Sequence, residues 1–235
     1  MIALLGVAWI GCSAPSESTA ALTTTPTLSA MEWTLDWHLD GATPVTGDRW
    51  ALTTDLGYEV ILDAGFIVTS LVSLVPCDTD TGLARALNWV LPIARAGHPP
   101  FDDPSLVKLG AKESFTPARS ATLPGTAFPP TAYCSVYWLT ARGAPATDAA
   151  NTSLHARGEW RRNGKTGPVA IDTNFARAMI DDLPPLDAEV RAAHGVVSRS
   201  VGSLFDGIDF ETDNEYAIGW GAIKNLTDHA TFHWE

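Results

Sequence analysis

Residues 32–39 read EWTLDWHL, and this stretch decides the fold class. Trp33, Leu35, Trp37 and Leu39 alternate with residues that are polar or charged. Successive side chains of a strand point to opposite faces of a sheet, so this alternation predicts a strand with one dry face and one wet face. Sheets that face water on one side are typically antiparallel.

Comparable segments recur along the rest of the chain, separated by short turns. The expected strands after the first cover residues 49–54, 58–63, 66–75, 133–142, 153–162, 169–175, 188–201 and 226–234. Asn163-Gly164 follows one of them directly, and this dipeptide favours a two-residue hairpin turn. Many short strands at this spacing predict an all-β protein, an antiparallel β-sandwich of about nine strands.

Two segments depart from this pattern. Residues 83–90 suit a short helix that is capped by Asp80 or Thr81 and ends near Pro92. The segment from Gly97 to Pro130 contains seven prolines and shows no sustained periodicity. We expect it to form one long loop.

The N-terminal segment has the features of an export signal. Residues 2–10 are uniformly apolar, too few to span a membrane but suited to the core of a signal peptide. Cys12 follows among small residues, as in bacterial lipoproteins that carry lipid on this cysteine. No Lys or Arg precedes the apolar run, and an ordinary strand is the alternative interpretation.

The predicted organisation therefore has three parts. Residues 1–12 are a signal peptide with the lipidation site, and residues 13–31 form a tether rich in Ser, Thr, Ala and Pro. Residues 32–235 form a single sandwich domain. The predicted location is the cell envelope, as an outer-membrane lipoprotein held to the membrane by its lipid.

Two further cysteines, Cys77 and Cys134, lie in strand-like surroundings. An oxidising compartment favours a disulfide between them. Two buried thiols or a pair of metal ligands are the alternatives. No CxxC sequence occurs, so neither a zinc ribbon nor a thioredoxin-like site is indicated.

Composition limits the partners. The chain has 235 residues, 46% of them hydrophobic, and a net charge of −12. Such a chain can bury a core, whereas binding of nucleic acid requires clustered cations, so no nucleic-acid partner is expected.

Sequence motifs for catalysis are missing. The chain lacks G-x-S-x-G, the P-loop, the dinucleotide-binding fingerprint and HExxH, so the sequence predicts no enzyme. Carboxylates gather at Asp206, Asp209, Glu211, Asp213 and Glu215. They are candidates for calcium, although a solvated acidic turn accounts for them more simply and they match no EF-hand.

Histidines are the candidate metal ligands. His98 begins the Pro-rich segment, His38 lies on the wet face of residues 32–39, and His229 and His233 lie near the C-terminus. On a strand the last two would be about 13 Å apart, so each would need a partner from elsewhere. Neutral imidazole suits copper, zinc and nickel.

Tryptophans are abundant, and most suit a core. Trp220 differs because Gly219 and Gly221 flank it, so its ring is the candidate platform for stacking a sugar or another ligand.

Several stretches together resemble bacterial secreted lipoproteins of the MbnP-like copper-binding family. They are residues 65–70 leading to 74–77, 96–98, 133–136, 154–158 and 205–210. The resemblance implies a β-sandwich of the periplasm or cell surface that binds copper beside a haem-protein partner. In some members a histidine and an oxidised tryptophan hold the metal, but neither maps onto a particular residue here.

Two functions follow as hypotheses. The first is an exported, lipid-anchored sandwich that binds a transition metal, copper first, without catalysis. The second is an adhesion or assembly module of the cell envelope that binds protein or glycan through exposed loops and aromatic rings.

Overall fold

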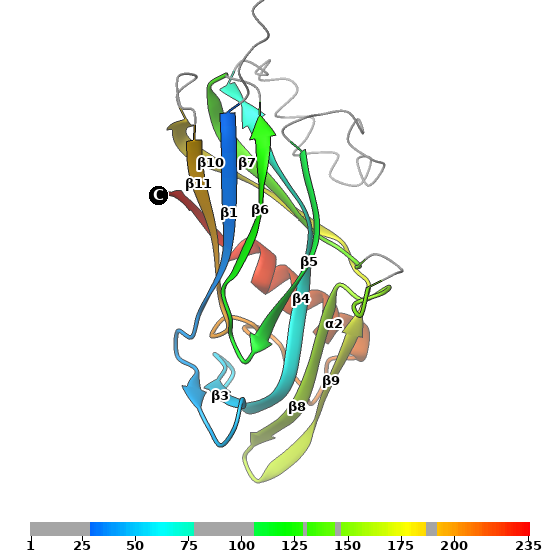
Figure 1. Ribbon diagram of the computed structural model, residues 1–235. Helices are drawn as coiled ribbons and strands as arrows, with labels where there is room; N and C mark the ends of the chain where they lie inside the picture. The colour runs from blue at the N-terminus through cyan, green and yellow to red at the C-terminus, as the bar shows by residue number, and fades with distance from the viewer. Residues whose placement is uncertain (1–28, 78–105, 129–130, 144–146, 187–191) are drawn as a thin grey trace, which may run out of the picture.

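A computed structural model describes residues 29–77, 106–128, 131–143, 147–186 and 192–235. In these residues twelve strands form two sheets, and one helix, α2 (Glu215–Asp228), packs beside them (Figure 1). The prediction of an all-β, sandwich-like fold is confirmed. The proposed signal peptide and the helix expected over residues 83–90 lie outside the described residues.

The smaller sheet contains the segment that decided the fold class. Its strand order is β12-β11-β1-β6, with β1 at Ser29–His38, β6 at Ala121–Phe128, β11 at Ala192–Ser200 and β12 at Thr231–Trp234. Trp33, Leu35 and Trp37 are buried on the inner face, as their alternation predicted. Because β1 starts at Ser29, the sheet begins inside the segment expected to be tether.

One pairing in this sheet corrects the prediction of a purely antiparallel sandwich. β1 runs parallel to β11, with Glu32 beside His194 and Asp36 beside Ser198. The two strands are far apart in sequence, so no tight hairpin fixes their relative direction. The other pairs of this sheet are antiparallel.

The larger sheet is built on one long strand, β4 (Glu59–Pro76). Its order is β10-β7-β4-β3-β2, with β5 and β8 also paired to β4 and with β9 paired to β8. The remaining strands are β2 (Thr43–Pro44), β3 (Trp50–Thr53), β5 (Leu106–Thr116), β7 (Tyr133–Thr140), β8 (Leu154–Arg162), β9 (Lys165–Thr173) and β10 (Arg177–Leu186).

The sequence predicted two strands where β4 is one. The pairing of β4 is irregular around Gly65, close to the boundary between the two predicted strands. The ring of Phe115 lies so close to Gly65 that an added Cβ would be 1.8 Å from it. Glycine therefore lets the strand continue under an aromatic ring.

The expectation of one long loop over residues 97–130 is wrong for much of its length. β5 and β6 lie inside that segment and pair with β4 and β1 respectively. Pro117 falls in the connection between them, and Pro124 lies in β6, at the edge of its sheet, next to an irregular step in the pairing. Edge strands and bulges tolerate proline because its missing N–H is not needed there.

The predicted hairpin is confirmed, whereas the C-terminal strand is only partly so. Asn163 and Gly164 both have positive φ, 50° and 77°, and join β8 to β9. Residues 226–234 do not form one strand, because α2 extends to Asp228 and β12 starts at Thr231. Local alternation missed this helix, which is held by packing against β9, β10 and β11.

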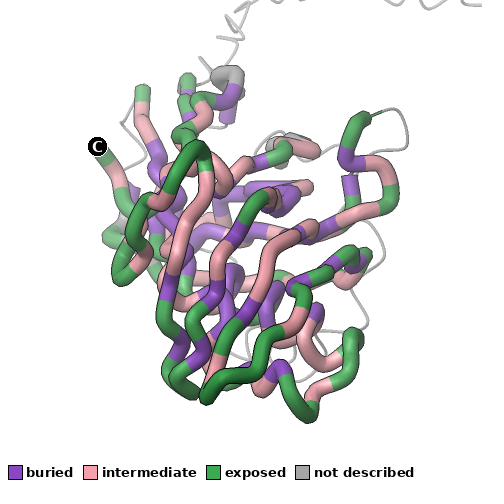
Figure 2. Tube along the Cα trace, turned by 90° about the horizontal axis from the view of Figure 1, so that it is seen from below, coloured by how far each residue is buried: buried purple, intermediate pink, exposed green. Residues whose placement is uncertain are grey.

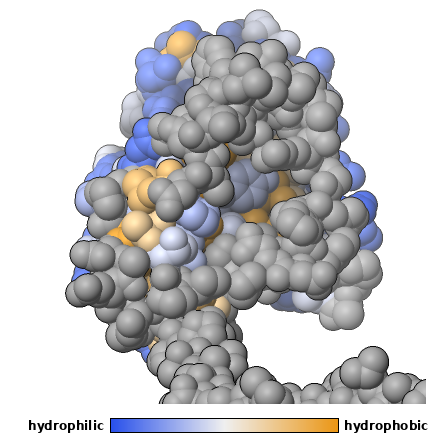
Figure 3. Space-filling model, turned by 90° about the horizontal axis from the view of Figure 1, so that it is seen from above, coloured by the Kyte–Doolittle hydropathy of each residue, from blue (hydrophilic) through white to orange (hydrophobic). Residues whose placement is uncertain are grey.

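The described residues form two hydrophobic clusters in the interior. One lies among β3, β4, β8, β9 and α2, and the other lies between the smaller sheet and β4, β7 and β10. Viewed from below, buried and intermediate residues alternate along the strands, and exposed residues gather mainly at the turns on the periphery (Figure 2). Viewed from above, hydrophilic side chains of the described part lie mainly along the rim (Figure 3).

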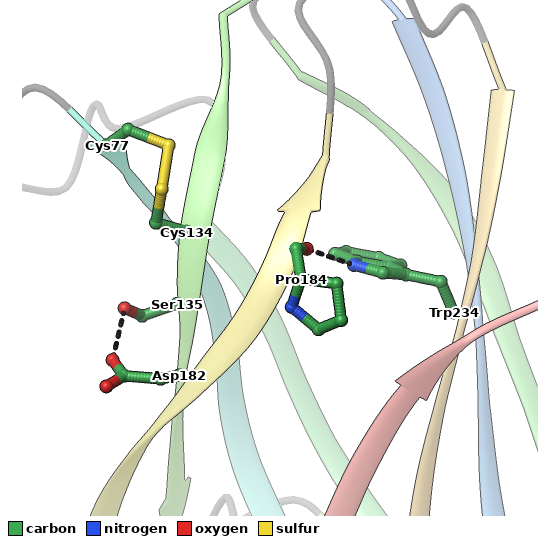
Figure 4. Close-up of a disulfide and its surroundings, with 6 residues drawn as sticks. All are labelled: Cys77, Cys134, Ser135, Asp182, Pro184 and Trp234. Carbon is green, nitrogen blue, oxygen red and sulfur yellow. Dashed lines mark hydrogen bonds between the residues drawn. A yellow bond between two sulfur atoms is a disulfide. The ribbon is translucent and has the colours of Figure 1, made fainter.

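A disulfide joins Cys77, just after β4, to Cys134 in β7, with the two Cα atoms 4.9 Å apart (Figure 4). Nearby, the indole of Trp234 on β12 donates a hydrogen bond to the Pro184 carbonyl on β10. That bond ties an edge of the smaller sheet to an edge of the larger one. Among the described residues, no helix has the length and apolarity to cross a membrane.

Candidate functional site

An open groove lies between the end of β9 and the start of α2, and it consists of two adjoining hollows. The larger is about 370 Å³ and the smaller about 250 Å³. Asp172, Thr173 and Glu215 line both. Asn151, Thr152, Asn174, Phe175 and Tyr216 complete the larger hollow, and Arg157, Ala170, Ile171 and Gly219 complete the smaller.

The β8–β9 hairpin positions the carboxylate of Asp172. In the register of this hairpin His155 lies directly opposite Asp172, and their Nδ1 and Oδ1 atoms are 2.7 Å apart. Arg157 donates a hydrogen bond to the other carboxylate oxygen. Partial burial raises the pKa of Asp172, but the hydrogen bonds from His155 and Arg157 outweigh it, and the net pKa lies below the ordinary value. Asp172 is therefore an ionised acceptor at neutral pH.

The helix α2 supplies the opposite wall. The side chain of Asn214 caps the helix by accepting a hydrogen bond from the Ala217 N–H. Gly219 faces Thr173, where an added Cβ would make contact at 3.4 Å, so the helix lies close against the end of β9. This approach brings Glu215 and Tyr216, in the first turn, to the rim of the groove.

Tyr216 is the most exposed large hydrophobic side chain in the described part of the chain. It is 67% exposed, against 48% for Ile180 and 38% for Leu56. Its ring packs edge-on against Phe175, with centroids 4.8 Å apart. Phe175 thus holds the tyrosine ring while leaving it open to a ligand.

The predicted platform, Trp220, lies one helical turn further on. It is half-buried rather than exposed, because Phe175 packs against it with centroids 5.9 Å apart and the guanidinium of Arg177 lies 5.8 Å from its ring. Trp220 and Tyr216 therefore contact the same phenylalanine, and Tyr216 is the ring that faces solvent.

This arrangement suits the binding of a polar ligand that has one flat apolar face. The groove offers a ring for stacking, two carboxylates as acceptors, and the amides of Asn151 and Asn174 as both donors and acceptors. A few directional polar groups around an aromatic wall are typical of small-molecule sites.

Of the predicted metal ligands, His38 and His233 lie far apart in the smaller sheet. His38 lies beside Ser200 of β11 and His233 beside Val196, which separates them by about 13 Å along the strands and by two strand spacings across. His229 is the C-cap of α2, and His98 lies outside the described residues. Within the described ranges no three His, Cys, Asp or Glu side chains are placed to hold a metal ion. Copper binding stays a prediction.

One histidine pair does share a carboxylate. On the outer face of the smaller sheet, Glu235 lies 3.2 Å from Nδ1 of His194 and 3.6 Å from Nε2 of His233. His194 also hydrogen bonds to Thr34. No local pattern pairs these two histidines, because His194 on β11 and His233 on β12 come together only through the pairing of strands that α2 separates in the chain.

Several carboxylates of the acidic segment proposed for calcium are engaged by other residues of the protein. Asp209 accepts hydrogen bonds from Tyr58 and from the Glu211 N–H, and Asp213 accepts one from the Asp209 N–H. Glu211 pairs with Lys165. These carboxylates stabilise a turn, which is the simpler of the two interpretations.

The His155–Asp172 pair resembles part of a catalytic relay, but it lacks a nucleophile. Among the described residues, no hydroxyl or thiol is hydrogen bonded to His155, whose ring instead stacks on Phe66 with centroids 5.2 Å apart. The pair is better explained as the support of Asp172.

Sequence reasoning missed most of the groove. It noted Glu215 as one of the acidic cluster and Trp220 as a platform, but not Asp172, Phe175 or Tyr216. The available signal was the order Asn214, Glu215, Tyr216: a cap residue, then an acidic residue, then a ring four positions before Trp220.

No family model, curated protein or solved structure matches this chain. The resemblance to copper-binding lipoproteins stays a prediction, and the function has to be argued from the groove itself.

Proposed function

We propose that this protein is a non-catalytic glycan-binding module of the cell envelope and that the groove between β9 and α2 holds the sugar. The observation that carries the proposal is the exposed ring of Tyr216 at the rim of a hollow whose lining, apart from Phe175, consists of polar and charged residues.

Sugar rings match this combination of groups. The C–H face of a pyranose is apolar and packs on an aromatic ring, while its hydroxyls donate to carboxylates and accept from amides. The ring of Tyr216 is two-thirds exposed, so its face is accessible for stacking against a sugar.

The support around the ring favours a preformed site. Phe175 holds Tyr216 from one side, and His155 and Arg157 hold Asp172 from the other. A site whose side chains are already fixed loses little conformational freedom when a ligand binds.

The display at the envelope is part of the same proposal and comes from the sequence. Lipid on Cys12 would tether the domain through the segment that precedes β1, residues 13–28, so that the groove could reach glycans near the membrane surface.

The test compares the native protein with Tyr216→Ala for binding of short cello-oligosaccharides, malto-oligosaccharides and chito-oligosaccharides, the last both with free amines and N-acetylated. Loss of a stacking ring is worth about 1–2 kcal/mol, so binding to the sugar that the native protein captures is expected to weaken about tenfold. Tyr216→Phe keeps the ring and is expected to retain binding. Isothermal titration calorimetry provides the measurement.

Ile180→Ala is the matched control, because it removes another exposed apolar side chain, on β10. The proposal fails if no sugar of the panel binds the native protein, or if Tyr216→Ala and Ile180→Ala bind equally well.

A further inference from the structure

We infer that the glycan bound in the groove carries a free amine, as a 2-amino-2-deoxy sugar does. This inference rests on the proposed function and names the class of sugar.

The charged side chains that line the groove favour a cationic ligand. Asp172 and Glu215 are anionic, and Arg157 is the cation among the lining residues. Arg157 is already engaged, since it donates hydrogen bonds to the Asp172 carboxylate and to the carbonyls of Ala156 and Ile171. The groove therefore has no unengaged cation among its lining residues with which to meet an anionic sugar.

The carboxylate of Glu215 is available to a ligand. In contrast to Asp172, its carboxylate makes no hydrogen bond or ion pair with another described residue, and it is exposed beside Tyr216 in the first turn of α2. Both residues line the larger hollow. A pyranose stacked on Tyr216 would present its ring substituents to Glu215, and an ammonium group is the substituent that a carboxylate favours most.

The whole molecule adds to this preference. The net charge is −12, which raises the local concentration of cations and opposes the approach of uronates and phosphorylated sugars. A cation near the ring of Tyr216 is also attracted by the negative face of that ring.

A lysine side chain of a basic peptide has the same charge but a different shape. It is a slender chain, and it would leave most of a hollow of about 370 Å³ unfilled. A hexosamine ring fills more of this space and covers the aromatic surface, so the groove favours the sugar.

The experiment compares chitosan oligosaccharides with fully N-acetylated oligosaccharides of the same length, using the full chain. At low salt the oligosaccharides with free, protonated amines are expected to bind about two- to fivefold more tightly than the acetylated ones. This ratio corresponds to the free energy of an exposed ion pair. Glu215→Gln keeps the shape of the side chain and one acceptor oxygen but removes the charge, so it is expected to weaken binding of the free-amine sugar more than binding of the acetylated sugar and to narrow this difference. Raising the salt concentration should reduce the difference in the native protein.

Glu59→Gln is the matched control, since it removes the same charge from the first residue of β4, which does not line the groove. Equal binding of the two sugars, or a preference that Glu215→Gln leaves intact, overturns the inference while the glycan-binding function stands. If only a lysine-rich peptide binds, and in a Tyr216-dependent way, both proposals fail.

Discussion

At the scale of single residues, Arg199 and Glu113 form a buried ion pair within the described part of the chain. Arg199 is 1% exposed, and Glu113 opposite it is also 1% exposed. Arg199 on β11 donates to both carboxylate oxygens of Glu113 on β5, to Thr69 on β4 and to the Leu226 carbonyl of α2. One guanidinium thus links both sheets and the helix.

We expect Arg199→Met to lower the free energy of unfolding by about 3–5 kcal/mol, because it leaves the Glu113 carboxylate buried without its partner. The double variant Arg199→Met/Glu113→Leu is expected to regain most of that loss, since it leaves no unpaired charge. Urea unfolding monitored by tryptophan fluorescence measures both.

The exposed pair of Arg161 and Glu159 is the control for this prediction. Their side chains are 50% and 39% exposed, so Arg161→Met should change the free energy of unfolding by less than about 1 kcal/mol. A double variant that is no more stable than Arg199→Met alone would contradict the explanation.

At the scale of elements, α2 decides whether the groove exists. Its sequence contains Gly219 and Gly221, and glycine disfavours a helix, so propensity alone would not form it. Gly219 packs against Thr173, and Gly221 packs against Ile208. Because glycine has no side chain, the helix can approach both residues closely. The helix depends on this packing and on its cap, Asn214.

Asn214→Ala is expected to cost about 1 kcal/mol of stability, because the Ala217 N–H loses its acceptor at the helix start. Since Glu215 and Tyr216 follow the cap directly, sugar binding should weaken as well. Thermal unfolding and calorimetric titration measure the two effects.

Asn214→Asp keeps an acceptor oxygen at the same position and should preserve both properties. If Asn214→Ala is as stable as the native protein and binds equally well, the cap does not position the groove.

At the scale of the whole molecule, a disulfide links the ends of β4 and β7 within the larger sheet, and a hydrogen bond from Trp234 to Pro184 links the smaller sheet to the larger one. The disulfide joins residues 57 positions apart in sequence, and the bond from Trp234 to Pro184 lies close by (Figure 4). A covalent link of this span removes conformational freedom from the unfolded chain more than from the folded one.

Replacing both cysteines, Cys77→Ala and Cys134→Ala, is expected to lower the free energy of unfolding by about 2–4 kcal/mol. Chemical unfolding with and without dithiothreitol is the measurement. The reductant should destabilise the native protein by a similar amount and leave the double variant unchanged. A native protein insensitive to the reductant and as stable as the variant would show that the link contributes nothing.

Particular residues show how far local patterns reach. The alternation from Trp33 to Trp37 predicted both a strand and its buried face, and Asn163-Gly164 predicted a hairpin, because each depends only on neighbouring side chains or on backbone conformation. Proline content misled the prediction for residues 97–130, since an edge strand tolerates proline and the edge is defined only once β1 has its partners.

Local patterns of side chains were enough to predict the class of fold, the faces of its clearest strands and a pair of cysteines suited to a disulfide. The parallel pairing of β1 with β11, the helix that packs on β9 and the groove lined by Asp172 and Tyr216 became visible only in the folded chain. The physical reason is that these features come from contacts between segments distant in sequence, whose free energy depends on long-range packing that no local periodicity records.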